Sequence, residues 1–473
     1  MSLALRVVTL ALAGILAGCA SLEADRNLAD ADALARETAG ASPRLLRSDA
    51  DRSEARAEVD RLLADSLGAD EAVRIAVGYG ASLQASLFEG AARSAAATQS
   101  ARLPNPIFAF GRLVRDNEVH GHDLDIERTL VLSVLDLVLL PARLRAADFQ
   151  QQQLRMRTAG DIVQAAVEAR QAWVRAVAAE QAAAYAQQVK DAADASAELA
   201  RRMQAVGNFS KLQRAREQAF YADAVAQLAR AQQAARAARE ALVRTLGLDA
   251  QQAARLRLPG RLPDLPSAAR DESVMARTAL EERLDVRMAR ADLEYLARQQ
   301  GLTRVTSYVN GLEVAARRNS QTGQPPQKGY EIEMRLPIFD FGDARRAQAE
   351  ATYMAALNRV ALVGSHATSQ VREAYGAYRT AYDLARHYRD EVVPMRKSIA
   401  DEMLLKYNGM LIGVFELLAD SRAQIAAVMQ AIEAERDFWL AEAALRASVV
   451  GRPLGGAAME IKSAPSTSAA GGH

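Results

Sequence analysis

The longest helical segment of this chain limits its fold more than any other feature. After Pro141, the sequence as far as Ala205 contains no proline and one glycine, Gly160. Small and apolar residues recur in it at alternating steps of four and three, the spacing of one helix face. That stripe consists of Ile162, Ala166, Ala169, Trp173 and Ala176. About 65 residues at ~1.5 Å each span roughly 95 Å, which predicts a rod or one stave of a tube rather than a compact globule.

The same order of patterns occurs twice along the chain. Asp136 and Asp340 follow similar apolar segments and lie about 200 positions apart, and so do Gly207 and Gly409, which interrupt helical patterns. The pattern therefore predicts the same order of elements in each half: a helix, two strands, a long helix, a glycine break and a returning helix. A proline-rich segment at 257–270 predicts a linker between the halves.

These patterns give the expected domain boundaries. The order is a signal peptide at 1–18, an N-terminal tether at 19–66, repeat 1 at 67–256, the linker at 257–270, repeat 2 at 271–451 and a disordered tail at 452–473. Repeat 1 contains a β-hairpin at about 103–134 and a long helical hairpin at about 141–248. Repeat 2 contains a β-hairpin at about 303–338 and a long helical hairpin at about 342–450.

The clearest strand alternates apolar and charged residues. Tyr330, Ile332, Met334, Leu336 and Ile338 alternate with Glu331, Glu333 and Arg335, which indicates one apolar and one charged sheet face. Its expected partner is 303–317, across a polar loop at 318–328. The first half offers strands at 103–113 and 124–134, in which Arg128 interrupts the apolar face and the loop carries His120 and His122.

If this protein crosses a membrane, the strands rather than helices are the expected crossing elements; in a soluble sheet the charged face would meet water and the apolar face a core. After the signal segment no stretch of about 18 apolar residues occurs. Four strands cannot close a membrane barrel, since the smallest bacterial barrels have about eight, and an open edge in lipid leaves backbone groups unpaired. We therefore expect several chains to share one barrel.

The N-terminus has the features of an export signal. Arg6 precedes an apolar run from Val7 to Leu16, and Leu16-Ala17-Gly18-Cys19 follows. This segment resembles the lipobox of bacterial lipoproteins, which implies cleavage before Cys19 and a covalent lipid on that residue; an ordinary signal peptide is the alternative. Ala20 is not the Asp that retains enteric lipoproteins in the inner membrane, so the resemblance implies an outer-membrane anchor.

Four motifs, in order, resemble the TolC-like outer-membrane factor family. They are the helix around Ala69 to Ala76, the turn at Ala101 to Pro106, the junction at Leu336 to Gly342 and the segment Tyr407 to Arg422. The resemblance covers most of 67–451. It implies a mainly α fold with a small β part, in which two tandem repeats give long coiled-coil hairpins and four transmembrane strands per chain.

The resemblance also implies an assembly and a function. Three chains would complete a 12-stranded barrel in the outer membrane and an α-helical barrel in the periplasm. This homotrimer would be a passive exit duct for substrates delivered by an inner-membrane transporter through a periplasmic adaptor protein. The family has no enzymatic activity and no cofactor apart from the lipid on Cys19, and the net charge of +1 offers no field for nucleic acid.

The family pattern suggests pore residues after the second glycine break. Glu416 occupies the first acidic position, Ala419 the second, and Asp420 follows. In the first half, Lys211, Arg214 and Arg216 follow Gly207 and could pair with acids of neighbouring helices in a closed state. A solvated acid on a helix face is the alternative for Glu416.

The hairpin tips are the expected surface for the adaptor. Both breaks contain glycine, and we expect Gly207 and Gly409 to adopt the left-handed backbone that reverses a hairpin. The docking residues expected at the tips are Gly207, Asn208, Phe209, Ser210, Gly409, Met410 and Gly413.

Other chemistry has weak support. His120 and His122 lack the further ligands that a metal site needs. The methionines at 395, 403 and 410 have helical spacing, which favours packing over a copper relay. We therefore expect no metal site. A periplasmic adaptor is one alternative function, but such a protein has one helical hairpin nested between β-rich domains. A structural coiled-coil lipoprotein is the other, and it would not need the alternation at 330–338.

Overall fold

The computed structural model describes residues 23–117, 121–271, 283–306, 312–334 and 338–451. These residues divide into two compact units, each built from three stretches of the chain. Unit 1 combines residues up to 30 with 89–156 and 286–365, and unit 2 combines 31–88 with 157–285 and the residues from 366 onward. Cys19 and the C-terminal tail lie outside the described residues.

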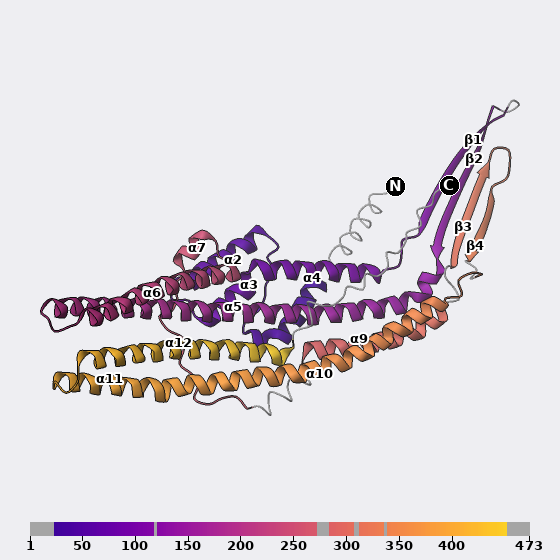
Figure 1. The fold of residues 1–473 in the computed structure, drawn as a ribbon. Helices are drawn as coiled ribbons and strands as arrows, with labels where there is room; N and C mark the ends of the chain where they lie inside the picture. The colour runs from indigo at the N-terminus through magenta and orange to yellow at the C-terminus, as the bar shows by residue number, and fades with distance from the viewer. Residues whose placement is uncertain (1–22, 118–120, 272–282, 307–311, 335–337, 452–473) are drawn as a thin grey trace. The chain divides into compact units, whose positions relative to one another are not determined.

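Helices make up most of the described chain (Figure 1). The first half contains α2 (Asp49–Leu62), α3 (Ala69–Tyr79), α4 (Ala81–Ser100), α5 (Val134–Ala205), α6 (Lys211–Leu246) and α7 (Ala250–Arg255). The second half contains α9 (Leu284–Thr306), α10 (Asp343–His387), α11 (Val393–Asn408) and α12 (Val414–Val450). Residues 23–39 are also helical.

Unit 1 contains a four-stranded antiparallel sheet of order β1-β2-β3-β4. Its strands are β1 (Ile107–Asn117), β2 (Gly121–Ser133), β3 (Leu312–Gln321) and β4 (Gln327–Met334). The two hairpins are therefore joined by the pairing of β2 with β3, in which Leu130 lies opposite Ala316. In β4, Tyr330, Ile332 and Met334 are exposed and share one face, as the alternation predicted.

Several strand boundaries differ from the prediction. The first strand begins at Ile107 rather than 103, because Pro104 and Pro106 cannot donate to a ladder. Residues 303–306 are helical, as the end of α9. The expected loops are shorter than predicted: His122 belongs to β2, and much of 318–328 belongs to β3 and β4, leaving a turn at 322–326.

The long first-half helix also begins earlier than predicted. It starts at Val134, directly after β2, and Pro141 lies inside it. Pro141 removes one hydrogen bond of the second helical turn, but the apolar residues before it continue the helix. Proline alone was therefore a misleading start signal.

A second proline, Pro394, lies next to a π-helical turn in the long helical segment of the second half. Between α10 and α11, residues Tyr388–Val392 form a π-helical turn, and the amide of Val393 donates to the carbonyl of Tyr388. Pro394 follows within the first turn of α11 and has no amide hydrogen to donate. The wider turn lets the helix continue past this residue.

The expected N-terminal tether is structured from residue 23 onward. In unit 1, the amide nitrogen of Asn27 donates to Ser94 Oγ at 2.9 Å and to Gln151 Oε1 at 2.6 Å. In unit 2, Ala31, Ala35, Ala39 and other small residues of this segment are buried. These contacts make 23–66 part of the fold.

The proline-rich segment at 257–270 packs on aromatic side chains of α10 and α12 in unit 2. Leu265 lies in a buried cluster with Tyr378, Tyr382 and Phe438. The hydroxyl of Tyr382 donates to the carbonyl of Pro266 at 3.1 Å, and the indole of Trp439 donates to that of Pro263 at 3.1 Å. Tyr378 and Tyr382 therefore serve the packing of this segment against α10 and α12.

Glu435 of α12 gives this region a dependence on pH. Burial raises the pKa of its carboxyl, and Asp264 adds to the shift, while Arg261 and Arg389 oppose it. The folded state thus binds the proton more tightly than the unfolded chain, so stability falls as pH rises from about 4.3 through the folded pKa.

We predict that Glu435→Gln stabilises unit 2 at pH 7, by on the order of 0.5 kcal/mol, and that this gain disappears below pH ~4. Thermal unfolding followed by circular dichroism at both pH values measures it. Glu433→Gln, at an exposed position of the same helix, is the control. A gain that persists at low pH would contradict the assignment.

Candidate functional site: the helical hairpin tips

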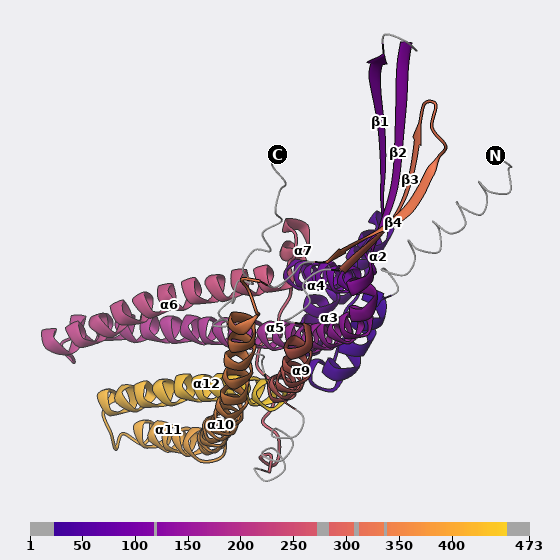
Figure 2. The same cartoon turned by 90° about the vertical axis from the view of Figure 1, so that its right-hand side faces the viewer.

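The two helical hairpins of unit 2 end on the same side of that unit (Figures 1 and 2). One tip joins α5 to α6 through residues 206–210, and the other joins α11 to α12 through residues 409–413. The residues predicted for docking and gating therefore lie close to one end of unit 2.

The first tip has the predicted left-handed glycine. Gly207 has φ +82°, and the amide of Asn208 donates to the carbonyl of Met203 at 2.9 Å while that of Gly207 donates to Gln204 at 3.0 Å. This pair of bonds is a Schellman motif. Ser210 then caps α6 in a capping box with Gln213.

The second tip differs from the prediction by one residue. Gly409 has φ −79°, whereas Met410 has φ +57°. The amide of Leu411 donates to Lys406 at 2.9 Å and that of Met410 donates to Tyr407 at 3.0 Å, so the Schellman motif is centred on Met410. The left-handed position follows the last helical turn and not the glycine, and the expectation for Gly409 was wrong.

Apolar side chains are exposed at both tips. Met410 is 94% exposed, and Leu411, Leu405, Val206 and Leu212 are also largely exposed. Phe209, in contrast, is only 8% exposed, so this predicted docking residue packs inside the tip. Leu212 and Leu405 lie outside the predicted docking residues but contribute to the exposed apolar surface.

Behind the tips, an ion pair with a buried carboxylate joins the two hairpins. Glu217 of α6 is 2% exposed, and both of its carboxylate oxygens accept hydrogen bonds from Arg422 Nη2 of α12, at 2.8 and 2.9 Å. Ser196 Oγ of α5 donates to Glu217 Oε2 at 2.7 Å. The guanidinium also lies over the ring of Phe220, 4.3 Å from its centroid.

The packing around this ion pair is thin. Its neighbours are a small buried cluster of Val189, Ala193 and Ala224, with Tyr185, Phe220, Tyr221 and Ile425 against it. The carboxylate of Glu217 is buried, whereas the side chain of Arg422 is 36% exposed. Removing Arg422 would leave a buried carboxylate without its cation, which costs a few kcal/mol. The junction of the hairpins therefore depends on Arg422 and Glu217 remaining together.

The predicted gating residues are not paired with one another. Glu416 is exposed in the first turn of α12. The side chain of Asp420 is 12% exposed, 4.0 Å from Arg396, and its Oδ2 is buried without a hydrogen-bond partner in the structure. Arg214 donates to Gln204 Oε1 at 2.8 Å, an amide rather than an acid, and Lys211 opens α6.

Sequence reasoning missed Glu217 and assigned no role to Arg422. A signal was available, because both residues interrupt apolar stripes. Glu217 precedes Ala224 by two helical turns, and Arg422 precedes Ile425 by three positions. Opposite charges on two facing apolar stripes indicate a pair, but the sequence alone does not show which stripes face each other.

Other candidate chemistry has no assembled site in the described structure. No cluster of three or more His, Cys, Asp or Glu suited to a metal occurs among the described residues. His122 Nδ1 lies 2.7 Å from Asp116 Oδ1, and His120 lies outside the described residues. Met395 and Met410 are exposed, so the packing role expected for them is wrong within this chain.

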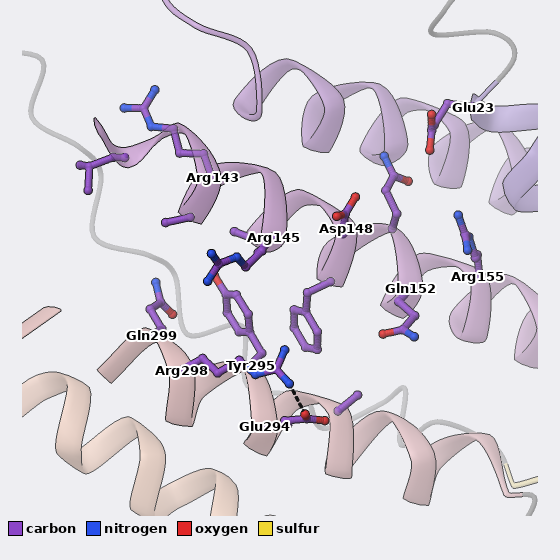
Figure 3. A pocket seen from close by; sticks show the side chains of 16 residues that line it. Glu23, Arg143, Arg145, Asp148, Gln152, Arg155, Glu294, Tyr295, Arg298 and Gln299 are labelled. Carbon is purple, nitrogen blue, oxygen red and sulfur yellow. Dashed lines mark hydrogen bonds and ion pairs between the residues drawn. The ribbon is translucent and has the colours of Figure 1, made fainter. Parts of the chain in front are cut away.

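A hollow of about 640 Å³ lies between α5 and α9 in unit 1 (Figure 3). Phe149 and Tyr295 stack across it with ring centroids 4.3 Å apart, and burial raises the pKa of Tyr295, with Asp292 adding to the shift. The charges lining it are largely neutralised, since Arg298 pairs with Glu294 and Arg155 pairs with Asp30. It therefore has the features of a packing defect between helices.

In the described parts of the chain, none of the helices combines the length and apolar character needed to cross a membrane.

The two tips differ in a way that substitutions can test. We predict that Met410→Gly stabilises the second tip by roughly 0.5–1 kcal/mol, because glycine has no penalty in the left-handed region. Gly207→Ala should destabilise the first tip by about 1 kcal/mol, whereas Gly409→Ala should be near neutral. Hydrogen–deuterium exchange of the tip peptides measures each change. Equal losses for Gly207→Ala and Gly409→Ala would contradict the observed backbone.

Comparison with solved structures identifies proteins with a similar fold. No known family model matches the sequence, and no curated relative matches it. Among solved structures, the CmeC outer membrane channel of Campylobacter jejuni has a TM-score of 0.68 and 13% identity over 87% of this chain and 89% of that chain. VceC, an outer membrane protein of Vibrio cholerae, has a TM-score of 0.65 and 14% identity over 85% and 97%.

A membrane protein from Pseudomonas aeruginosa has a TM-score of 0.66 and 19% identity, covering 83% of this chain and 93% of that chain. CusC and the MtrE channel of Neisseria gonorrhoeae are also similar. These named neighbours are channels or membrane proteins and not enzymes. The chain has the fold of the TolC-like outer-membrane channels.

Proposed function

We propose that this chain is the outer-membrane channel of a tripartite efflux system. Three copies would form a passive exit duct, a periplasmic adaptor would dock on the hairpin tips, and an inner-membrane transporter would supply both the substrate and the energy. Cleavage before Cys19 and lipidation of that residue would anchor each chain in the outer membrane, with the helical part in the periplasm.

The amphipathic sheet of unit 1 is the observation that carries this proposal. β1 pairs only with β2 and β4 only with β3 among the described strands, so the sheet has two open edges. Tyr330, Ile332 and Phe108 are exposed on one face, which suits lipid. Since open edges in lipid leave backbone groups unpaired, three copies paired edge to edge would give a closed barrel of twelve strands.

The tips have the chemistry of a docking surface. Exposed apolar side chains at Val206, Leu212, Leu405, Met410 and Leu411 lie on both hairpin ends. Apolar residues concentrated at loop tips favour contact with an apolar partner surface. A helical hairpin of an adaptor is the partner that this proposal assigns to them.

The buried pair of Arg422 and Glu217 supports a gate at the same end. It connects α12 to α6, and so it connects the second helical hairpin to the first. Moving the hairpins apart would break both hydrogen bonds and hydrate the two charges. The pair therefore favours the arrangement described here over a more open one, and a docked adaptor would supply the energy that separates it.

We predict that Arg422→Ala increases the conductance of the full-length protein in planar lipid bilayers several-fold, because an unpaired Glu217 costs about 3–5 kcal/mol in the closed arrangement. The wild-type protein should fractionate with the outer membrane and migrate as a heat-sensitive trimer. Arg201→Ala, which removes an exposed ion pair with Glu198 within α5, is the control.

Two outcomes of this experiment would count against the proposal. A wild-type protein that is monomeric and absent from the outer membrane would contradict the channel itself. A trimeric channel whose conductance is equal in Arg422→Ala and Arg201→Ala would leave the channel in place but remove the gate from this ion pair.

Glu416 gives a second test of the duct. Three copies of an exposed carboxylate around a threefold axis would attract cations and repel anions. We predict that Glu416→Ala lowers the cation-to-anion permeability ratio measured from reversal potentials in a salt gradient, while Glu402→Ala, at an exposed position of α11, does not. An unchanged ratio would remove Glu416 from the pore constriction.

A further inference from the structure

Three cations lie in one row across the sheet of unit 1. Arg128 of β2 lies opposite Arg318 of β3, and Arg318 lies opposite Lys328 of β4. Residues directly opposite in antiparallel strands point to the same face, with Cα atoms about 4.5–5.5 Å apart. Arg112 of β1 lies two positions beyond Phe110, the β1 residue of this row, on the same face.

This row belongs to the apolar face of the sheet. The next row contains Phe108, Leu130, Ala316 and Tyr330, and the row after it contains Leu132, Val314 and Ile332. The opposite face contains most of the acids of the strands, namely Asp123, Asp125, Glu127, Glu313, Glu331 and Glu333. The two faces therefore differ in charge as well as in polarity.

No acid neutralises the row within the described chain. Asp116 is the acid on the same face of the described strands, and it pairs with His122. Arg317, which neighbours Arg318 along β3, points to the other face and pairs with Glu331 at 2.5 Å. Like charges directly opposite each other destabilise a sheet, so an anion from outside the strands would stabilise the row.

The position of the row fits the edge of a membrane. The pair of Arg318 and Lys328 is followed by one further pair, Asn319 with Gln327, before the polar turn. An Arg or Lys on the lipid face costs about 2–4 kcal/mol at the bilayer midplane and about 0–1 near the interface. The row therefore belongs at headgroup depth, with the apolar rows towards the hydrocarbon.

We propose that Arg128, Arg318 and Lys328 form a binding site for the phosphate groups of anionic membrane lipids on the outside of the barrel. The inference rests on the proposed function, because it places this sheet face against lipid. Guanidinium groups bind phosphate oxygens through two parallel hydrogen bonds. Lys328 adds a third positive charge to the row at the edge strand.

The test uses the full-length protein reconstituted into phosphatidylcholine vesicles with and without phosphatidylglycerol. Lipids that remain bound after mild detergent extraction are counted by native mass spectrometry. We expect the wild type to retain phosphatidylglycerol selectively. The triple variant Arg128→Gln/Arg318→Gln/Lys328→Gln should bind it about 100-fold more weakly, since each basic residue near an anionic surface contributes roughly a factor of five.

Two control variants separate the row from general charge and from misfolding. Arg115→Gln/Arg317→Gln removes two cations from the opposite face of the same sheet and should retain the lipid. Arg128→Lys/Arg318→Lys keeps the charge and should weaken binding less than ten-fold. Equal losses in the triple variant and the opposite-face variant would overturn the site.

The remaining outcomes are also decisive. If inorganic phosphate alone displaces the lipid completely at millimolar concentration, the site binds free phosphate and the lipid assignment is wrong. If the wild type retains phosphatidylcholine as well as phosphatidylglycerol, the row is not a site for anionic lipid. If the protein does not enter vesicles at all, the proposed channel fails and this inference fails with it.

Discussion

Backbone hydrogen bonding at the edges of a small sheet is the constraint on which the rest of this molecule depends. The outer strands β1 and β4 each have one neighbour among the described strands, so each presents a row of unpaired amide and carbonyl groups. In water such an edge is tolerated, but in hydrocarbon every unpaired group costs several kcal/mol. A single chain therefore cannot insert this sheet into lipid, and the edge strands must pair with those of other chains before the sheet is stable in a membrane.

In the proposed assembly, the arrangement of the helical hairpins also depends on a partner. Near their tips, the hairpins of unit 2 contact each other through a small apolar cluster and the ion pair of the buried Glu217 with Arg422. A large apolar interface would hold the hairpins together firmly, whereas a partner could separate a thin interface with one charge pair at a cost of a few kcal/mol. A partner that binds the exposed apolar tips could supply a difference of that size.

Periodicity predicted the elements of this fold better than their boundaries. The alternation at 330–334 and the stripe around Trp173 correspond to β4 and α5. Burial explains the stripe of α5, where Trp173 is 2% exposed, whereas every residue of β4 is exposed and its alternation follows the two faces of a strand. Single residues were less reliable. Pro141 lies inside a helix, and Met410 rather than Gly409 takes the left-handed position, because the length of the last helical turn decides where the chain reverses. Arg128 weakened the prediction of its strand because it interrupts the apolar face. The strand register shows that Arg128 is aligned with two other cations, Arg318 and Lys328, and the sequence alone does not give that register.

The π-helical turn at Tyr388–Val392 has a mechanical consequence. A helix bends where its hydrogen-bond ladder departs from the regular pattern, and here that point also lies next to Pro394. A force applied at Met410 would flex the chain at this turn. The segment beyond it is α11, 16 residues or about 24 Å long at the usual rise. It would swing as a short lever, so a small rotation at its base would give a displacement of several ångströms at the tip.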